Sequence, residues 1–171
     1  MADRSGSRRR PRRKGAAVKD GQRRQLARAS RHAAAAPPAA AEWARVLCDG
    51  GSRGNPGPAA AAAVLLAPDG EVLDRRALPI GRATAAEAEY RAILLGLELA
   101  ARNGADPLEL CSDSLLAIEA LQRKRAVAAG LAPLVGEIAA ASAGFSAVAW
   151  RWHPARDNEL ADALVRELLW R

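Results

Sequence analysis

The pattern of hydrophobic and polar positions divides the chain at about residue 42. Residues 1–41 contain few large aliphatic side chains, too few to bury the surface that would offset the entropy of ordering the chain. From residue 42 onward, short apolar runs alternate with turn signals and with longer amphipathic stretches. The pattern therefore predicts a disordered tail over 1–41 and a single folded domain over 42–171.

Short apolar runs bounded by Gly, Pro, Asn or Asp predict five strands, at residues 44–48, 59–66, 71–80, 108–111 and 145–152. A Pro-Asp-Gly turn at 68–70 predicts that the second and third strands form a hairpin. Apolar side chains at helical spacing, with Thr84 and Glu87 as a capping box, predict a helix over 84–101. Further helices are expected at 114–121, 131–143 and 158–170. The order β-β-β-α-β-α-α-β-α is typical of a mixed α/β domain.

The net charge of +7 is unevenly distributed. Residues 1–41 hold 12 Lys and Arg against two acids and carry +10, whereas residues 42–171 carry −3. A basic segment of this density favours polyanionic partners such as nucleic acid. Two interpretations of the tail stay open: a non-specific phosphate-binding tether, or a solvated segment of an alanine- and arginine-rich chain.

Composition also excludes several classes of protein. No apolar run approaches the roughly 18 to 20 residues of a membrane span, and the basic N-terminus lacks the apolar stretch of a signal peptide. A cytoplasmic protein without a membrane partner is expected. Cys48 and Cys111 are too few for a disulfide framework, and their spacing matches no zinc motif. Strand alternation predicts that the two cysteines point to opposite faces of the sheet.

Four acidic residues are candidates for chemistry. Asp49 and Asp113 follow predicted strands, and the carboxyl ends of neighbouring parallel strands converge on one crevice. Two carboxylates held that close call for a hard cation such as Mg²⁺. Glu89 and Asp162 lie beside the apolar stripes of two predicted helices. Taken alone, each aspartate after a strand is more typical of a turn or N-cap, and each helical acid of an exposed surface.

Four motifs in order change that interpretation. The run Asp49-Gly50-Gly51-Ser52-Arg53-Gly54-Asn55-Pro56-Gly57-Pro58 resembles the opening motif of type 1 ribonuclease H. Ala88-Glu89-Tyr90, Ser112-Asp113-Ser114 and Asn158-x-x-Ala161-Asp162-x-Leu164 resemble the three motifs that follow it in that family. The resemblance covers about residues 43–170 and keeps the family's spacing.

The resemblance implies a ribonuclease H-like α/β fold: a five-stranded mixed sheet, with the first three strands antiparallel, flanked by helices. It also implies a monomeric endonuclease that hydrolyses the RNA strand of RNA/DNA hybrids and leaves a 5′-phosphate and a 3′-hydroxyl. Two Mg²⁺ ions, with Mn²⁺ as a possible substitute, would be held by Asp49, Glu89, Asp113 and Asp162. No obligate protein partner is implied.

Substrate contacts follow from the same resemblance. Gly50, Gly51, Ser52 and Asn55 would approach the RNA strand, although Asn55 could instead stabilise its own turn. The chain departs from the family at Ala85 and Ala86, where two asparagines are common, and at Leu115, where Gln or Lys is common. The family's basic handle helix is missing. In its place, Arg123, Lys124 and Arg125 would either touch the DNA strand or form a solvated loop.

His153 leaves two alternatives open. Many members of the family carry a mobile histidine before the last helix that assists catalysis, whereas others have a Trp-Val-Pro-Arg segment there. Trp152-His153-Pro154-Ala155-Arg156 matches the second pattern, with His153 in the valine position. The rival function is a catalytically weak module that binds hybrid or double-stranded RNA on the same fold. The intact acidic tetrad favours the enzyme.

Overall fold

The computed structural model describes residues 42–170, so the predicted tail over 1–41 lies outside the described residues. The strands are β1 (Ala44–Ser52), β2 (Gly57–Leu66), β3 (Val72–Ala83), β4 (Leu108–Ser112) and β5 (Val148–Trp152). The helices are α2 (Ala85–Arg102), α3 (Leu115–Leu121), α4 (Ala132–Ser142) and α5 (Glu159–Leu169), with single 3₁₀ turns η1 (Ala129–Leu131) and η2 (Ala155–Asp157). None of the helices within 42–170 is long and apolar enough to cross a membrane.

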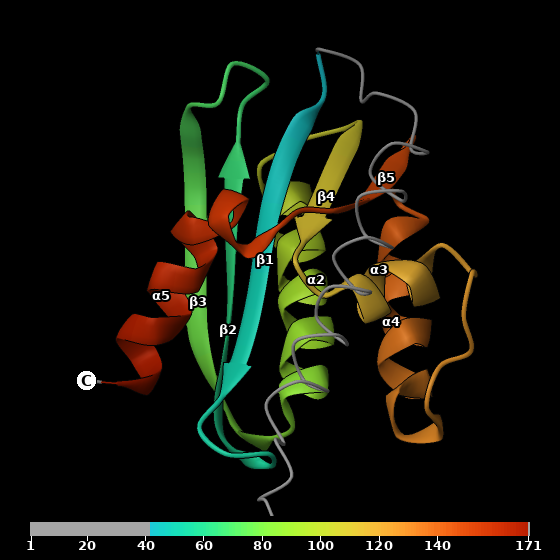
Figure 1. Cartoon of the computed structure of the whole chain (residues 1–171). Coiled ribbons are helices and arrows are strands. Elements are labelled where there is room, and N and C mark those ends of the chain that lie inside the picture. Colours follow the sequence, from blue (N-terminus) through green and yellow to red (C-terminus); the bar gives the residue numbers. More distant parts are fainter. Residues whose placement is uncertain (1–41, 171) are drawn as a thin grey trace, which may run out of the picture.

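The strands form one mixed sheet in the order β3-β2-β1-β4-β5 (Figure 1). β1 pairs antiparallel with β2, and β2 with β3, whereas β4 runs parallel to β1 and to β5. The predicted hairpin is present: Gly70 adopts φ +95° and donates its N–H to the Ala67 carbonyl. The predicted fold class is confirmed, including the antiparallel arrangement of the first three strands.

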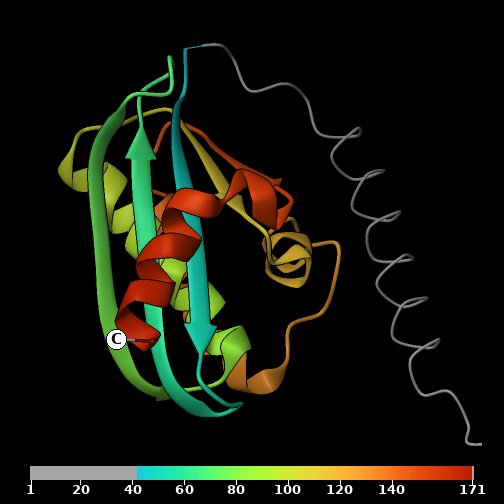
Figure 2. The same cartoon turned by 60° about the vertical axis from the view of Figure 1, so that its left-hand side comes forward.

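Helices cover both faces of the sheet. Helix α2 packs on one face against β1 and β2, with α4 beside it, and α5 packs on the other face of the same two strands (Figures 1 and 2). The alanines of β2 fill both layers: Ala61 and Ala63 belong to the core under α2, whereas Ala60 and Ala62 lie against α5. Their small side chains let both helices approach closely.

The boundaries differ from the prediction at one functionally important place. Strand β1 does not end in a turn at Asp49 but continues through Gly50 and Gly51, which pair with Ala61 and Ala60 of β2. The chain turns only afterwards, before β2 begins at Gly57. Glycine has a low strand propensity, which is why the sequence indicated a turn, but here its lack of a side chain serves packing.

The last strand is shorter than predicted. Strand β5 begins at Val148, whereas the apolar pattern indicated residue 145. The N–H of Phe145 donates to the Ser142 carbonyl in the turn that follows α4, so Phe145 closes that helix instead of opening the strand. The two cysteines do lie on opposite faces, Cys48 in the core under α2 and Cys111 in the core that includes Ala161 of α5.

Candidate metal centre

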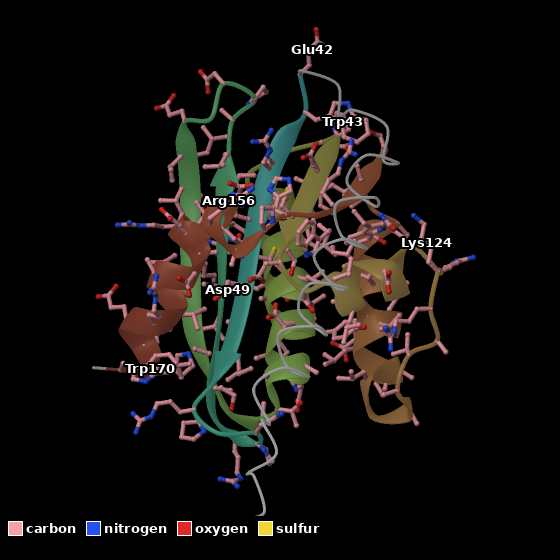
Figure 3. The ribbon with its side chains drawn as sticks, in the orientation of Figure 1. Glu42, Trp43, Asp49, Lys124, Arg156 and Trp170 are labelled. Atoms are coloured by element: carbon pink, nitrogen blue, oxygen red, sulfur yellow. The ribbon has the colours of Figure 1, made fainter. Side chains whose placement is uncertain are left out.

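Two aspartates lie near the carboxyl ends of the parallel strands β1 and β4: Asp49 within β1, and Asp113 directly after β4. Cys48 of β1 is in register with Ser112 of β4, so Asp49 and Asp113 stand side by side one residue later. Glu89 reaches the same point from the first turns of α2. The three carboxylates each offer an oxygen within 4.8 Å of the others. Figure 3 shows Asp49 near the middle of the molecule, on the strand between α2 and α5.

The start of α2 is fixed by local contacts that place Glu89. Thr84 caps the helix, its Oγ1 accepting the N–H of Glu87 at 3.1 Å, which is one half of the predicted capping box, while the Glu87 carboxylate pairs with Arg91. Gly50 lets the helix backbone approach the sheet, because a Cβ at Gly50 would stand 2.2 Å from the carbonyl carbon of Ala88. The Glu89 carboxylate then accepts hydrogen bonds from the Gly50 backbone and the Ser112 side chain.

The electrostatics of the cluster call for a cation. Burial, followed by the charges of Asp113 and Asp162, raises the pKa of Asp49 from 3.8 to about 7. Burial, followed by the charges of Asp113 and Asp49, raises the pKa of Glu89 well above its usual range, and burial also raises that of Asp113. Among the described residues, Glu89 Oε2 and Asp113 Oδ1 are buried without a hydrogen-bond partner. Hard divalent ions such as Mg²⁺ take oxygen ligands of this kind, so the donor set fits one.

The fourth predicted acid stands beside this group. Asp162 lies in the first turn of α5, and its charge contributes to the raised pKa of both Asp49 and Asp113. Its carboxylate is 40% exposed and pairs with Arg166 one turn later. The helix start is tied to the centre by Asn158, whose Nδ2 donates to the Cys48 carbonyl at 2.9 Å. Asp162 is not one of the three acids whose oxygens lie within 4.8 Å of one another.

The two predicted substrate-binding glycines are packed beneath helices. Gly50 lies under α2 as described, and a Cβ at Gly51 would stand 2.9 Å from Cγ1 of Val165 in α5. Glycine at both positions is thus explained by the close approach of one helix on each face. The sequence interpretation did not foresee this packing role.

Ser52 and Asn55 shape the loop between β1 and β2. Ser52 Oγ lies 2.8 Å from the carbonyl oxygen of Ala83, which anchors the loop to the end of β3. Asn55 Oδ1 accepts the N–H of Ala85 at 3.2 Å, so its side chain bonds the first residue of α2. Both residues thus fix the loop against the end of β3 and the start of α2.

None of the basic residues after α3 belongs to the group of three carboxylates. Arg123 adopts φ +57° and turns the chain. Lys124 lies on the side of the molecule opposite α5 (Figure 3). The Arg125 guanidinium stands 3.7 Å from the buried carboxylate of Glu119. Arg125 also lines a groove of about 420 Å³ with Tyr90 from the start of α2 and other residues of α3 and the following loop.

His153 does not join the three carboxylates. Its Nε2 lies 3.5 Å from Cys111 Sγ and 3.8 Å from Glu109 Oε1, while its backbone N–H donates to the Ser112 carbonyl. Burial lowers the pKa of His153, with Glu109 acting in the opposite direction. Glu109 was not singled out from the sequence, although a lone acid within the apolar run 108–111 is a signal that could have drawn attention to it.

The comparisons with known proteins agree on one family. A family model described as Reverse transcriptase-like matches residues 47–168. Ribonuclease HI of Halobacterium salinarum is 39% identical over 132 residues, which cover 71% of this chain and 61% of that protein. Bifunctional protein Rv2228c of Mycobacterium tuberculosis is 37% identical over 126 residues, 72% of this chain and 35% of that protein. The chain thus matches less than two thirds of the length of these relatives.

Solved structures give the same answer. The H. salinarum RNase H1 structure superimposes with a TM-score of 0.71 at 38% identity, covering 72% of this chain and 95% of that one. LC11-RNase H1, solved in complex with an RNA/DNA hybrid, has a TM-score of 0.69 at 29% identity and covers 72% and 94%. With its mixed sheet, its acidic cluster and these likenesses, the chain belongs to the ribonuclease H1 family.

Proposed function

We propose that this chain is a metal-dependent endonuclease that hydrolyses the RNA strand of RNA/DNA hybrids. The observation that carries the proposal is the group of Asp49, Glu89 and Asp113, whose oxygens lie within 4.8 Å of one another with two of them buried and unpaired. A module that only bound phosphates would gain nothing from concentrating acids against them. The chain's similarity to LC11-RNase H1, which was solved with such a hybrid, supports the substrate class.

Four acids would hold the metal ions in the proposed mechanism. Asp49, Glu89 and Asp113 would supply ligands from the buried group, and Asp162 would supply another from the first turn of α5. Two bound Mg²⁺ ions would supply an activated water and stabilise the charge that develops on the leaving 3′-oxygen. The protein holds these carboxylates fixed through Gly50, the Ser112 side chain and the Asn158 contact to β1. The products would be a 5′-phosphate and a 3′-hydroxyl.

The remaining parts of the proposal concern ligands and setting. Mg²⁺ is the expected ion because all candidate ligands are oxygens, and Mn²⁺ is expected to substitute. The loop from Ser52 to Asn55 would approach the RNA strand, whose 2′-hydroxyls distinguish it from DNA. Arg123, Lys124 and Arg125 would contact the DNA strand. We further propose that the protein acts as a monomer in the cytoplasm.

A pair of matched substitutions tests the proposal. Asp113→Asn removes one charge from the cluster, whereas Asp69→Asn makes the same change in the distant β2–β3 turn, where Asp69 accepts the N–H of Glu71. With a labelled hybrid and Mg²⁺, we expect wild type and Asp69→Asn to cleave alike and Asp113→Asn to lose at least about a hundredfold in rate. Equal cleavage by the two variants would overturn the assignment.

The same experiment addresses the alternative of a binding module. Ala85 and Ala86 stand where the family often has two asparagines, so the grip on substrate is expected to be weaker. If wild-type protein binds the hybrid but leaves the RNA uncut in both Mg²⁺ and Mn²⁺, the binding module replaces the enzyme.

A further inference from the structure

We propose that Glu109, Cys111 and His153 form a second metal site, selective for zinc or a similar borderline-soft divalent ion. Glu109 and Cys111 alternate along β4 and therefore point to the same face of the sheet. His153 follows β5, the parallel neighbour of β4, and turns its ring back toward them. The site shares no ligand with the carboxylate cluster and is independent of the proposed function.

The distances between the three donor atoms match zinc coordination. Sγ of Cys111 lies 3.5 Å from Nε2 of His153 and 3.6 Å from Oε1 of Glu109, and the last two atoms are 3.8 Å apart. Tetrahedral zinc with bonds of about 2.3 Å to sulfur and about 2.1 Å to nitrogen and oxygen separates such atoms by about 3.6, 3.6 and 3.4 Å. The two separations that involve Cys111 Sγ already agree with these values. A small rotation of the His153 ring would shorten the third, between His153 Nε2 and Glu109 Oε1.

The chemistry of the donors separates the two sites. A thiolate, an imidazole and a carboxylate suit zinc, whereas the all-oxygen cluster at Asp49 suits Mg²⁺. The His153 side chain is 25% exposed while that of Glu109 is 7% exposed, so an ion would enter beside the histidine and keep a fourth position toward solvent. The thiol would release its proton when the ion binds.

Two arginines orient the carboxylate of Glu109. Arg45 Nε lies 3.6 Å from Oε1, and Arg151 Nε lies 3.7 Å from Oε2. An ionised carboxylate has about four acceptor positions, so Oε1 retains one for a cation. The two positive charges nevertheless oppose a second cation. We therefore expect a dissociation constant of about micromolar, weaker than that of structural zinc sites.

An ion at this place would brace the chain next to the acidic cluster. The His153 backbone N–H donates to the Ser112 carbonyl, and Trp152 Nε1 donates to the carbonyl of Asp113 at 3.0 Å. Zinc would add a third link between the chain at the end of β4 and the chain at the end of β5. Because it would bind the folded chain in preference to the unfolded one, it would also raise the melting temperature.

Cobalt titration of the metal-free full-length protein tests the proposal. Co²⁺ bound to a thiolate gives a ligand-to-metal charge-transfer absorption that a carboxylate cluster cannot produce. In excess Mg²⁺, we expect a band that saturates at one equivalent of Co²⁺ and disappears when one equivalent of Zn²⁺ is added. Asp113→Asn should keep the band, which distinguishes this site from the proposed catalytic centre. A folded wild-type protein without the band would overturn the proposal.

The two cysteines supply a matched control. Both are free and buried, but Cys48 lies on the opposite face of the sheet. Cys111→Ser should abolish the band and Cys48→Ser should keep it, and the reverse result would overturn the site. Glu109→Gln and His153→Ala, verified as folded by circular dichroism, should each bind Co²⁺ at least about tenfold more weakly. Unchanged affinity in both would also overturn it.

Discussion

Gly50 of β1 lies directly beneath Ala88 of α2, so close that a Cβ on the glycine would stand 2.2 Å from the carbonyl carbon of the alanine. This contact sets the distance between helix and sheet at the point where they carry Glu89 and Asp49. The packing of α2 on the sheet and the geometry of the acidic cluster therefore both depend on Gly50 having no side chain.

Gly50→Ala should therefore damage both stability and activity. The added methyl group meets backbone atoms that cannot turn aside, and overpacking of this kind costs about 1–3 kcal/mol in the free energy of unfolding. The shift of α2 should also move Glu89 and lower the rate of hybrid cleavage at least about tenfold. Thermal melting and the cleavage assay measure the two effects.

Gly136→Ala is the matched control for that substitution. Gly136 lies in α4, and a Cβ there would meet no described atom within 4 Å apart from its chain neighbours and the backbone of its own helix. Alanine is the better helix former, so this variant should gain about 0.5–1 kcal/mol and retain full activity. If Gly50→Ala behaved like Gly136→Ala, the close contact between α2 and β1 would not position the cluster.

The acidic cluster predicts an unusual pH dependence in the metal-free protein. The pKa of Asp49 is 3.8 ordinarily and about 7 in the fold. Between these values the folded chain retains a proton that the unfolded chain has released, so the free energy of unfolding falls as pH rises. The decrease amounts to at most about 1.4 kcal/mol per pH unit and levels off once the pH exceeds the folded pKa of Asp49.

Melting temperatures in a chelator at about pH 5 and about pH 8, on either side of that pKa, measure this effect. We expect the lower melting temperature at the higher pH. We also expect Mg²⁺ to raise the melting temperature far more at the higher pH than at the lower one, because the ion needs deprotonated ligands. Asp49→Asn should flatten the pH dependence in the chelator. A melting temperature that rises with pH over this range in the wild type without metal would contradict the assignment of Asp49.

The basic segment 1–41 predicts a salt effect on hybrid binding. It carries 12 Lys and Arg, and every phosphate that the protein neutralises steepens the fall of log affinity with log salt by about 0.9 for duplex DNA. Deleting 1–41 should weaken hybrid binding at low salt and flatten this slope. Replacing the basic residues between 8 and 14 with Gln in the full-length chain should also weaken binding at low salt and flatten the slope, but less than the deletion does. An unchanged slope would favour the interpretation as a solvated segment.

The order of the strands and helices in the described part of the chain was predictable because their patterns are local. Alternation, helical spacing and turn dipeptides marked each element, and even the alanine-rich β2 was predicted as a strand from the turns on either side. The predicted end of β1 and the predicted start of β5 were wrong. At the end of β1, Gly50 and Gly51 have turn-like propensities, but their pairing with β2 and their packing under two helices are tertiary effects.

The carboxylate cluster was predictable and the second cluster was not. The apolar runs predicted Asp49 and Asp113 near the ends of two strands, although β1 continues past Asp49 to Ser52, and the motifs added Glu89 and Asp162. Glu109, by contrast, is buried among Arg45, Arg151 and His153, which come from other parts of the chain. A zinc motif built from a single cysteine has no spacing rule by which it could be recognised.

Strand-resolved cleavage of a hybrid is the most direct test of the central claim. The hybrid would carry different labels on its RNA and DNA strands and would be incubated with full-length protein and Mg²⁺, with a chelator as the control. We predict internal cuts in the RNA strand alone, with 5′-phosphate and 3′-hydroxyl ends and no products in the chelator. An intact RNA strand, cleavage of the DNA strand, or cleavage that persists in the chelator would contradict the account.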